Sequence, residues 1–135
     1  MHNGHNSLHP DLRPIIVCLA GSTRFRQAFE QAACAETLAG RIVLSVGCFT
    51  HSSGYPLTAV EKSIVDQLHL RKIDMADELL VLNVNGYVGE STREAIRYAA
   101  RIGKPIRFLH PHSELQLREE ILGQFKDSLR SGATA

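Results

Sequence analysis

Short apolar runs alternate with amphipathic stretches along most of this chain. The run at 15–20 is continuously apolar and ends at Gly21, which is typical of a strand buried on both faces. Runs rich in β-branched and aliphatic residues at 41–46, 78–84 and 105–109 predict three further strands. The pattern therefore predicts four strands, separated by longer polar or amphipathic segments.

The segments between these runs carry apolar residues at helical spacing. This spacing extends over 25–38, over 60–75 and again over 113–129, and a further helix is expected to begin near Glu90. Strands that alternate with helices imply right-handed crossovers between parallel strands. We therefore expect an α/β fold, namely a small doubly wound (Rossmann-like or flavodoxin-like) parallel sheet of about four to five strands with helices on both faces.

The chain has the length of one domain. Residues 1–13 are polar and show neither helical nor strand periodicity, so we expect a mobile N-terminal tail there. A chain of 135 residues with 44% hydrophobic content can bury one core. We therefore expect a single domain over 14–130 and no second one.

Charge and composition argue against several classes of partner. The formal net charge is +1 and no long Lys/Arg run occurs, which disfavours a polymeric nucleic acid as ligand. The three cysteines have no Cys-x-x-Cys spacing, so a disulfide framework or a zinc ribbon is not indicated. No apolar run approaches the roughly 18 residues that a membrane helix needs, so a soluble, cytoplasmic protein with no membrane partner is expected. No metal or other cofactor is expected either, because the sequence places no third ligand near His110 and His112.

The turn after the first predicted strand carries a candidate binding site. Gly21 permits a tight turn, Ser22 or Thr23 can cap the following helix, and Arg24 adds a cation. A phosphate group or a ribose hydroxyl would fit such a turn. The segment lacks the Gly-Lys-Thr/Ser ending of a Walker A loop and the full dinucleotide fingerprint. The plain alternative is a helix cap with solvated arginines.

A second candidate segment follows the third predicted strand. It offers polar groups at Asn83, Asn85 and Ser91, while Gly89 stands directly before the expected helix. Free amides and the positive dipole end of that helix would attract an anion. Both turns lie at the C-terminal ends of parallel strands, so they are expected to converge on one crevice. The loop 47–56 is expected to cover it.

Two glutamates occupy the start of the third predicted helix. Glu90 and Glu94 are four residues apart, which places them on about the same helical face. A carboxylate there could attack an anomeric carbon. The plain alternative, acidic residues that stabilise the helix dipole, is the more frequent role. On the preceding helix, the position of His69 beside Arg71 and Lys72 favours a surface histidine over one that borders the crevice.

Four motifs in this order resemble the nucleoside 2-deoxyribosyltransferase superfamily over residues 15–109. They are Gly-Ser-Thr-Arg after the first strand, Met-Ala-Asp-Glu-Leu-Leu-Val-Leu, the loop that opens into a helix at 86–99, and Gly-Lys-Pro at 103–105. The superfamily includes base-exchanging transferases and nucleoside-monophosphate N-glycosidases, and this short chain looks more like the latter. A homodimer is expected by the same resemblance.

The resemblance implies a glutamate nucleophile at position 95, where this chain has Ala95. Glu94 is one residue away, but one residue turns a helical side chain by about 100°. Three explanations stay open: Glu94 acts after a one-residue slip of the helix start, Ala95 is a deliberate replacement of the nucleophile made to trap a substrate, or catalysis is lost and binding retained. Ordinary packing of Ala95 beside Ala99 is the plain alternative.

The function implied by the resemblance is cleavage of the N-glycosidic bond of a nucleoside 5′-monophosphate. Gly21, Ser22 and Arg24 would hold the phosphate, and the base would lie under the loop 47–56. Asn83, Asn85 and Ser91 would contact the sugar hydroxyls, while Glu90 would orient the nucleophile or a water. Base exchange between nucleosides and non-catalytic nucleotide sensing are the alternatives.

Overall fold

The computed structural model describes residues 12–49, 54 and 56–110. The chain order is β1 (Ile16–Ala20), α2 (Arg26–Leu38), β2 (Ile42–Leu44), α4 (Ala59–Met75), β3 (Glu78–Val81), the 3₁₀ helix η1 (Val84–Gly86), α5 (Glu90–Arg101) and β4 (Ile106–Phe108). The predicted closing helix at 113–129 and most of the predicted tail lie outside the described residues.

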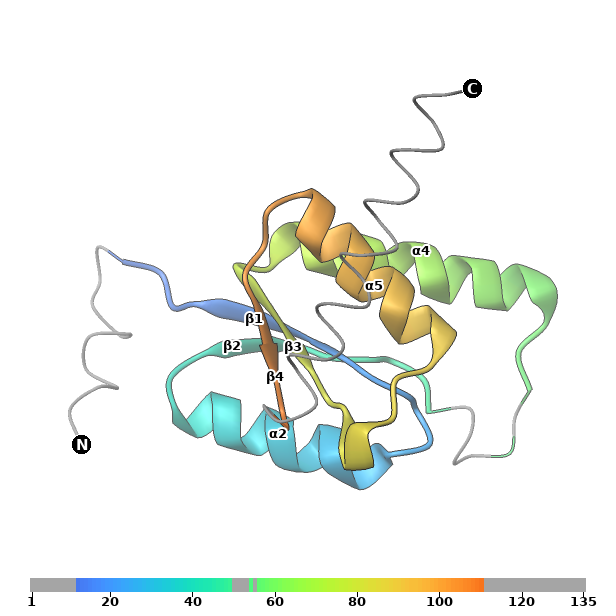
Figure 1. The fold of residues 1–135 in the computed structure, drawn as a ribbon, viewed down its shortest axis with the longest axis horizontal. Helices are drawn as coiled ribbons and strands as arrows, with labels where there is room; N and C mark the ends of the chain where they lie inside the picture. Colours follow the sequence, from blue (N-terminus) through green and yellow to red (C-terminus); the bar gives the residue numbers. More distant parts are fainter. Residues whose placement is uncertain (1–11, 50–53, 55, 111–135) are drawn as a thin grey trace.

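The four strands form one parallel sheet with the order β2-β1-β3-β4. Figure 1 shows α2 on one face of this sheet and α4 with α5 on the other. The predicted α/β fold with a parallel sheet is thus confirmed. The chain moves from β1 outward to β2 and then returns past β1 to β3, so its direction along the sheet reverses between β1 and β3. In open α/β sheets, such a reversal leaves a crevice at the carboxyl ends of the two strands.

Both faces of the sheet are buried, as the continuous apolar runs predicted. Along β1, Val17 and Leu19 pack in the cluster that includes Phe29 of α2. Cys18 and Ala20 point the other way and pack in the cluster with α4 and α5. Successive side chains of a strand alternate between faces, so a central strand covered on both sides is apolar at every position.

The strands begin at an edge held by ion pairs. Arg13 donates from Nη1 and Nη2 to the two carboxylate oxygens of Asp77, at 2.6 and 2.7 Å. The backbone N–H of Ile16 donates to the same carboxylate at 2.8 Å. These hydrogen bonds lower the pKa of Asp77 to about 2. Arg13, the last residue of the expected tail, is thus bound to Asp77, which directly precedes β3.

A second group of charges at this edge joins α2 to the sheet. Arg107 of β4 donates to Glu36 of α2 at 2.5 Å and to Glu78 of β3 at 2.8 Å. Arg41 lies 3.3 Å from the same Glu36 carboxylate, whose side chain is only 12% exposed. Removing one partner of such a cluster leaves a buried charge unpaired. These contacts therefore fix the C-terminal end of α2 against the strands.

The first turn of α4 is capped by hydrogen bonds between Thr58 and Glu61. The Thr58 hydroxyl accepts from the backbone N–H of Glu61, and the Glu61 carboxylate accepts from the backbone N–H of Thr58. This reciprocal capping box satisfies amides that the first turn of a helix leaves free. The predicted helix over 60–75 is confirmed, with bounds of Ala59–Met75. Its N-terminal half lies beside the carboxyl edge of the sheet.

Candidate functional site

The tight turn after β1 depends on the absence of a side chain at Gly21. A Cβ atom at this position would lie 3.1 Å from Cβ and 3.2 Å from the carbonyl oxygen of Leu82, and 3.5 Å from the ring of Phe29. Glycine therefore allows the turn to pass directly against the end of β3. The close approach brings the first predicted segment next to the second.

Ser22 organises this turn without capping α2. Its hydroxyl accepts from the backbone N–H of Arg24 at 3.4 Å and from Arg24 Nε at 3.1 Å. The residue at the N-cap of α2 is Phe25, and no side-chain hydrogen bond caps the helix. The expectation that Ser22 or Thr23 caps the helix is therefore wrong. The hydroxyl of Ser22 instead fixes the Arg24 side chain.

The two predicted segments meet at one cavity of about 450 Å³. It is lined from the turn after β1, from α4, and from the loop that leads into α5. The lining residues are Gly21, Ser22, Thr23, Arg24, Cys48, Leu57, Lys62, Val65, Asp66, His69, Tyr87, Gly89, Glu90, Ser91 and Thr92. Seven predicted site residues are thus brought together, namely Gly21, Ser22, Thr23, Arg24, Gly89, Glu90 and Ser91. Ser22 and Ser91 open onto the same space.

A second cavity of about 440 Å³ adjoins the first between α4 and α5. The two share four lining residues, which are Lys62, Asp66, His69 and Ser91. Glu94 and Ala95 line the second cavity. The predicted candidates of α5 are therefore divided, because Glu90 borders the first compartment whereas Glu94 and Ala95 border the second.

The three candidate catalytic positions differ in their surroundings. The Glu90 side chain is 72% exposed and accepts from Arg97 at 2.9 Å. Glu94 is exposed. Ala95 is 1% exposed and packs in the core cluster beneath α5, while its surface also borders the second cavity. A longer side chain at position 95 would begin at the boundary between the core and the cleft.

Asn83 and Asn85 do not line either of these two cavities. Asn83 is fully buried; its Oδ1 accepts from the backbone N–H of His110 at 3.0 Å, and its Nδ2 donates to the His110 carbonyl at 3.2 Å. Asn85 has a left-handed backbone with φ of 54°. The Asn83 side chain thus joins the segments that follow β3 and β4, while Asn85 is the left-handed central residue of η1.

His69 borders the cleft, which was the less favoured of the two sequence interpretations. It lines both cavities, and its Nε2 lies 3.2 Å from the Leu19 carbonyl oxygen. Because a carbonyl oxygen only accepts, Nε2 carries the hydrogen when this bond forms. Burial lowers the pKa of His69. The preference for a surface histidine is thus wrong, and the spacing of Lys62, Asp66 and His69 along one face of α4 was the available signal.

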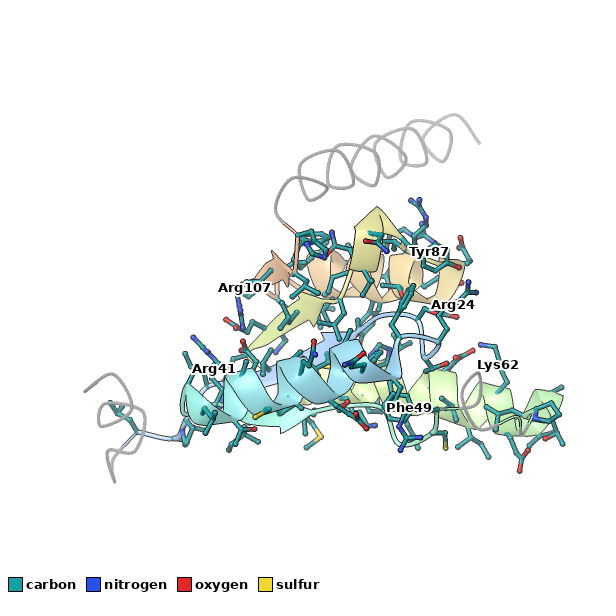
Figure 2. The ribbon with its side chains drawn as sticks, turned by 90° about the horizontal axis from the view of Figure 1, so that it is seen from below. Arg24, Arg41, Phe49, Lys62, Tyr87 and Arg107 are labelled. Atoms are coloured by element: carbon teal, nitrogen blue, oxygen red, sulfur yellow. The ribbon has the colours of Figure 1, made fainter. Side chains whose placement is uncertain are left out.

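Tyr87 is a lining residue that was not predicted. The Arg24 guanidinium lies over its ring, with Cζ 4.8 Å from the ring centroid. Phe25 meets the same ring edge-on at 5.9 Å between centroids. Figure 2 shows Arg24 and Tyr87 side by side at one end of the molecule, with Lys62 nearby. The turn after β1 and the loop after β3 are therefore in direct contact through their side chains.

The charges around the cleft are unequally compensated. Lys62 of α4 is paired with Asp66 at 2.9 Å. Over the described ranges, Arg24 has no carboxylate within salt-bridge distance. An arginine without a carboxylate partner retains its donors for an anion. The first cavity thus offers a cationic end at Arg24.

Neither a metal cluster nor a membrane helix occurs in the described part of the chain. No three His, Cys, Asp or Glu side chains there are placed to hold a metal ion. No described helix is long and apolar enough to cross a membrane. Comparison with protein-family models, with curated proteins and with solved structures gave no match to this chain.

Proposed function

We propose that the cleft binds a nucleoside 5′-monophosphate and that its chemistry is cleavage of the N-glycosidic bond by a carboxylate nucleophile. The observation that carries this proposal is that Ser22 and Ser91, from turns far apart in sequence, open onto one cavity of about 450 Å³. Ligand pockets typically measure about 300–1,000 Å³, so one nucleotide is a suitable occupant. The resemblance to the nucleoside 2-deoxyribosyltransferase superfamily supplies the class of reaction.

The phosphate is assigned to the turn after β1. Arg24 borders the cavity and has no carboxylate partner in the described chain, while Gly21 keeps the backbone free of side-chain atoms at the wall. Guanidinium groups match phosphate oxygens in geometry and charge. The first amides of α2 lie directly behind this turn and add to the attraction for an anion.

The sugar is assigned to the start of α5. Gly89 is the N-cap of this helix and Ser91 lies in its first turn, and both line the first cavity. Ser91 also borders the second cavity, so a sugar at Ser91 lies where the two compartments join. Position 95, one turn further along α5, is then below the anomeric carbon.

The reaction requires a carboxylate at position 94 or 95. The carboxylate oxygen attacks C1′, the C1′–N bond breaks, and its electron pair leaves with the base, which takes up a proton. Water then attacks the glycosyl ester, releases the sugar phosphate and frees the carboxylate. The methyl group of Ala95 cannot attack C1′. In the chain with Ala95, Glu94 would therefore be the nucleophile.

A second candidate function is favoured by the position of Glu94. Its side chain is exposed and lines only the second of the two compartments, whereas Ala95 is buried at the cleft boundary. A protein that binds nucleotides through the first compartment and does not cleave them is consistent with this arrangement. Base exchange is the third possibility and differs in releasing little free base when a second base is supplied.

The test compares the natural chain with Ala95→Glu and Glu94→Gln. Each protein is incubated with the four common nucleosides, their deoxy forms and the 5′-monophosphates of both, and free base is measured by chromatography. We expect Ala95→Glu to release base at least about a hundredfold faster than the natural chain, as expected when a nucleophile is restored. Ala100→Glu is the matched control, because Ala100 is an exposed alanine of the same helix.

The outcomes separate the candidate functions. Base release by the natural chain that is lost in Glu94→Gln assigns the nucleophile to Glu94. If Ala95→Glu and the natural chain are both inert while 5′-monophosphates bind, the sensor is correct and the glycosidase is rejected. Loss of free base on addition of a second nucleobase, with formation of a new nucleoside, identifies base exchange.

A further inference from the structure

Arg24 is held in place from two sides at the rim of the first cavity. Its Nε donates to the Ser22 hydroxyl at 3.1 Å, and its guanidinium lies 4.8 Å above the centre of the Tyr87 ring. Tyr87 belongs to the loop after β3, whereas Arg24 and Ser22 belong to the turn after β1. The orientation of the cation therefore depends on a contact across the two halves of the cleft.

The Tyr87 ring is itself positioned by neighbours on both sides. Phe25 packs edge-on against it with 5.9 Å between ring centroids. At Gly89, a Cβ atom would lie 3.2 Å from the Tyr87 hydroxyl and 3.6 Å from the ring. The absence of a side chain at Gly89 thus permits the tyrosine to fold back over the helix start. Figure 2 shows the ring beside Arg24.

An arginine side chain that is already held in place loses less conformational entropy when it binds an anion. A free arginine side chain loses rotamer freedom when a ligand immobilises it, and this loss opposes binding. A guanidinium that already lies on an aromatic face has given up part of that freedom. The Ser22 hydroxyl takes up only the Nε hydrogen of the Arg24 guanidinium, so the Nη N–H groups stay available for hydrogen bonds to an anion.

We propose that Tyr87 is the positioning residue that gives the cleft its preference for phosphorylated ligands, because its ring holds the Arg24 guanidinium where a phosphate monoester binds. This inference rests on the proposed nucleotide ligand, and it adds a residue that acts through Arg24. The ring of Tyr87, and not its hydroxyl, is the group that positions Arg24. Phenylalanine at this position therefore preserves the preference.

The experiment measures affinity by calorimetry, independently of any turnover. The probes are inorganic phosphate and matched pairs of a nucleoside and its 5′-monophosphate for each common base. We expect Tyr87→Leu to weaken binding of phosphate and of the monophosphates by about two- to fivefold, the effect of one exposed cation–π contact. Nucleoside affinity is expected to stay the same, and Tyr87→Phe is expected to behave like the natural protein.

A double-mutant cycle distinguishes positioning from direct contact. In an Arg24→Gln background, Tyr87→Leu is expected to have no further effect on phosphate binding. Circular dichroism and thermal unfolding check that each variant is folded. Equal weakening for nucleosides and monophosphates would overturn the inference, because Tyr87 would then contact the base or sugar. An unchanged phosphate affinity in Tyr87→Leu, or no phosphate binding by the natural protein, would overturn it too.

The proposed activity can fail while this inference holds. If no compound releases base but phosphate affinity still depends on Tyr87 through Arg24, the glycosidase is rejected and the positioning role stands. If base is released with the same preference for monophosphates in Tyr87→Leu as in the natural protein, the glycosidase stands and the positioning role is rejected.

Discussion

The arginines where the strands of the β-sheet begin differ from Arg24, where the strands finish, in having carboxylate partners. At the end where the strands begin, Asp77 is bound by Arg13, and Glu36 is bound by Arg41 and Arg107. At the end where the strands finish, Arg24 has no carboxylate partner in the described chain and borders a cavity. Figure 2 shows Arg41 and Arg107 far from Arg24 and Tyr87.

This difference separates stability from binding within one small sheet. A carboxylate enclosed by arginines lowers the free energy of the folded state only while all partners are present. A cation left without a partner contributes little to folding but is available to a ligand. We therefore expect substitutions at the first end to change the free energy of unfolding and those at the second to change ligand affinity.

The largest effect on stability is expected from Glu36→Gln. The substitution removes the charge that Arg41 and Arg107 enclose and is expected to lower the free energy of unfolding by about 2–3 kcal/mol. Urea denaturation measures this. Glu30→Gln is the control, because the exposed pair of Glu30 with Arg26 is worth less than about 1 kcal/mol. Equal losses in the two variants would remove the basis for the comparison of the two ends.

Gly21→Ala is expected to affect both stability and binding. The added methyl would lie 3.1 Å from the Leu82 side chain and 3.2 Å from its carbonyl oxygen, which is too close without a shift of the turn. We expect a loss of about 1–2 kcal/mol in the free energy of unfolding, together with weaker phosphate binding. Gly47→Ala is the control, because nothing lies within 4 Å of its added Cβ. If Gly21→Ala leaves phosphate affinity unchanged, the turn after β1 is not part of the phosphate-binding site.

His69 is expected to make the cleft end sensitive to acid. Burial favours its neutral form, so its pKa is lowered in the folded state. Its contribution to stability is present above the unfolded pKa of about 6.5 and is lost as the pH falls below that value. The slope for one such proton is at most about 1.4 kcal/mol per pH unit. Urea denaturation at pH 7.5 and at pH 5.5 measures it.

The matched variants for this prediction are His69→Gln and His110→Gln. Removing His69 is expected to flatten the loss of stability between the two pH values, whereas His110 is exposed and its removal is expected to leave the loss intact. Identical pH dependence in His69→Gln and the natural protein would show that the imidazole is not the group responsible.

The smallest effect is expected at Asn85, between the end of β3 and the cleft. Its φ of 54° is tolerated by asparagine and glycine but not by alanine, so Asn85→Ala is expected to cost about 1 kcal/mol and Asn85→Gly less than about 0.5 kcal/mol. Neither is expected to change nucleotide affinity, because Asn85 lies outside the two joined cavities. A selective loss of nucleoside binding in Asn85→Gly would show that the Asn85 side chain contacts the nucleoside.

Much of the fold could be predicted from the sequence, because it depends on local patterns. The continuous apolar run before Gly21 predicted a strand covered on both faces, and the helical spacing over 60–75 predicted α4, which extends from Ala59 to Met75. The strands proved shorter than their apolar runs, as at β3, which ends at Val81. Apolar content indicates burial, and residues beyond the end of the strand are buried as well, as are Leu82 and Asn83.

The candidate site could be predicted only in part. Ser22 and Ser91 were expected to converge on one crevice, and both line one cavity, since strand order and chain direction put both turns at one edge of the sheet. Asn83 was assigned to a ligand because it is polar, yet its amide joins two ends of the backbone. His69 was assigned to the surface because its neighbours are charged, although α4 turns it toward Leu19. Residue type gives the chemistry of a side chain but not its direction.

The sequence by itself determined the alternation of strands and helices, the apolar faces that cover the sheet, and the two polar turns that follow β1 and β3. These features leave a repeating pattern of apolar and polar residues over short stretches of the chain, so they can be recognised from the sequence alone. Only the tertiary structure decided that Tyr87 lies against Arg24, that His69 borders the cleft, and that Glu94 and Ala95 lie in its second compartment. These positions are set by the packing of loops and helices against the sheet. A rotation of α4 by one residue would move His69, and a rotation of α5 by one residue would move Glu94 and Ala95.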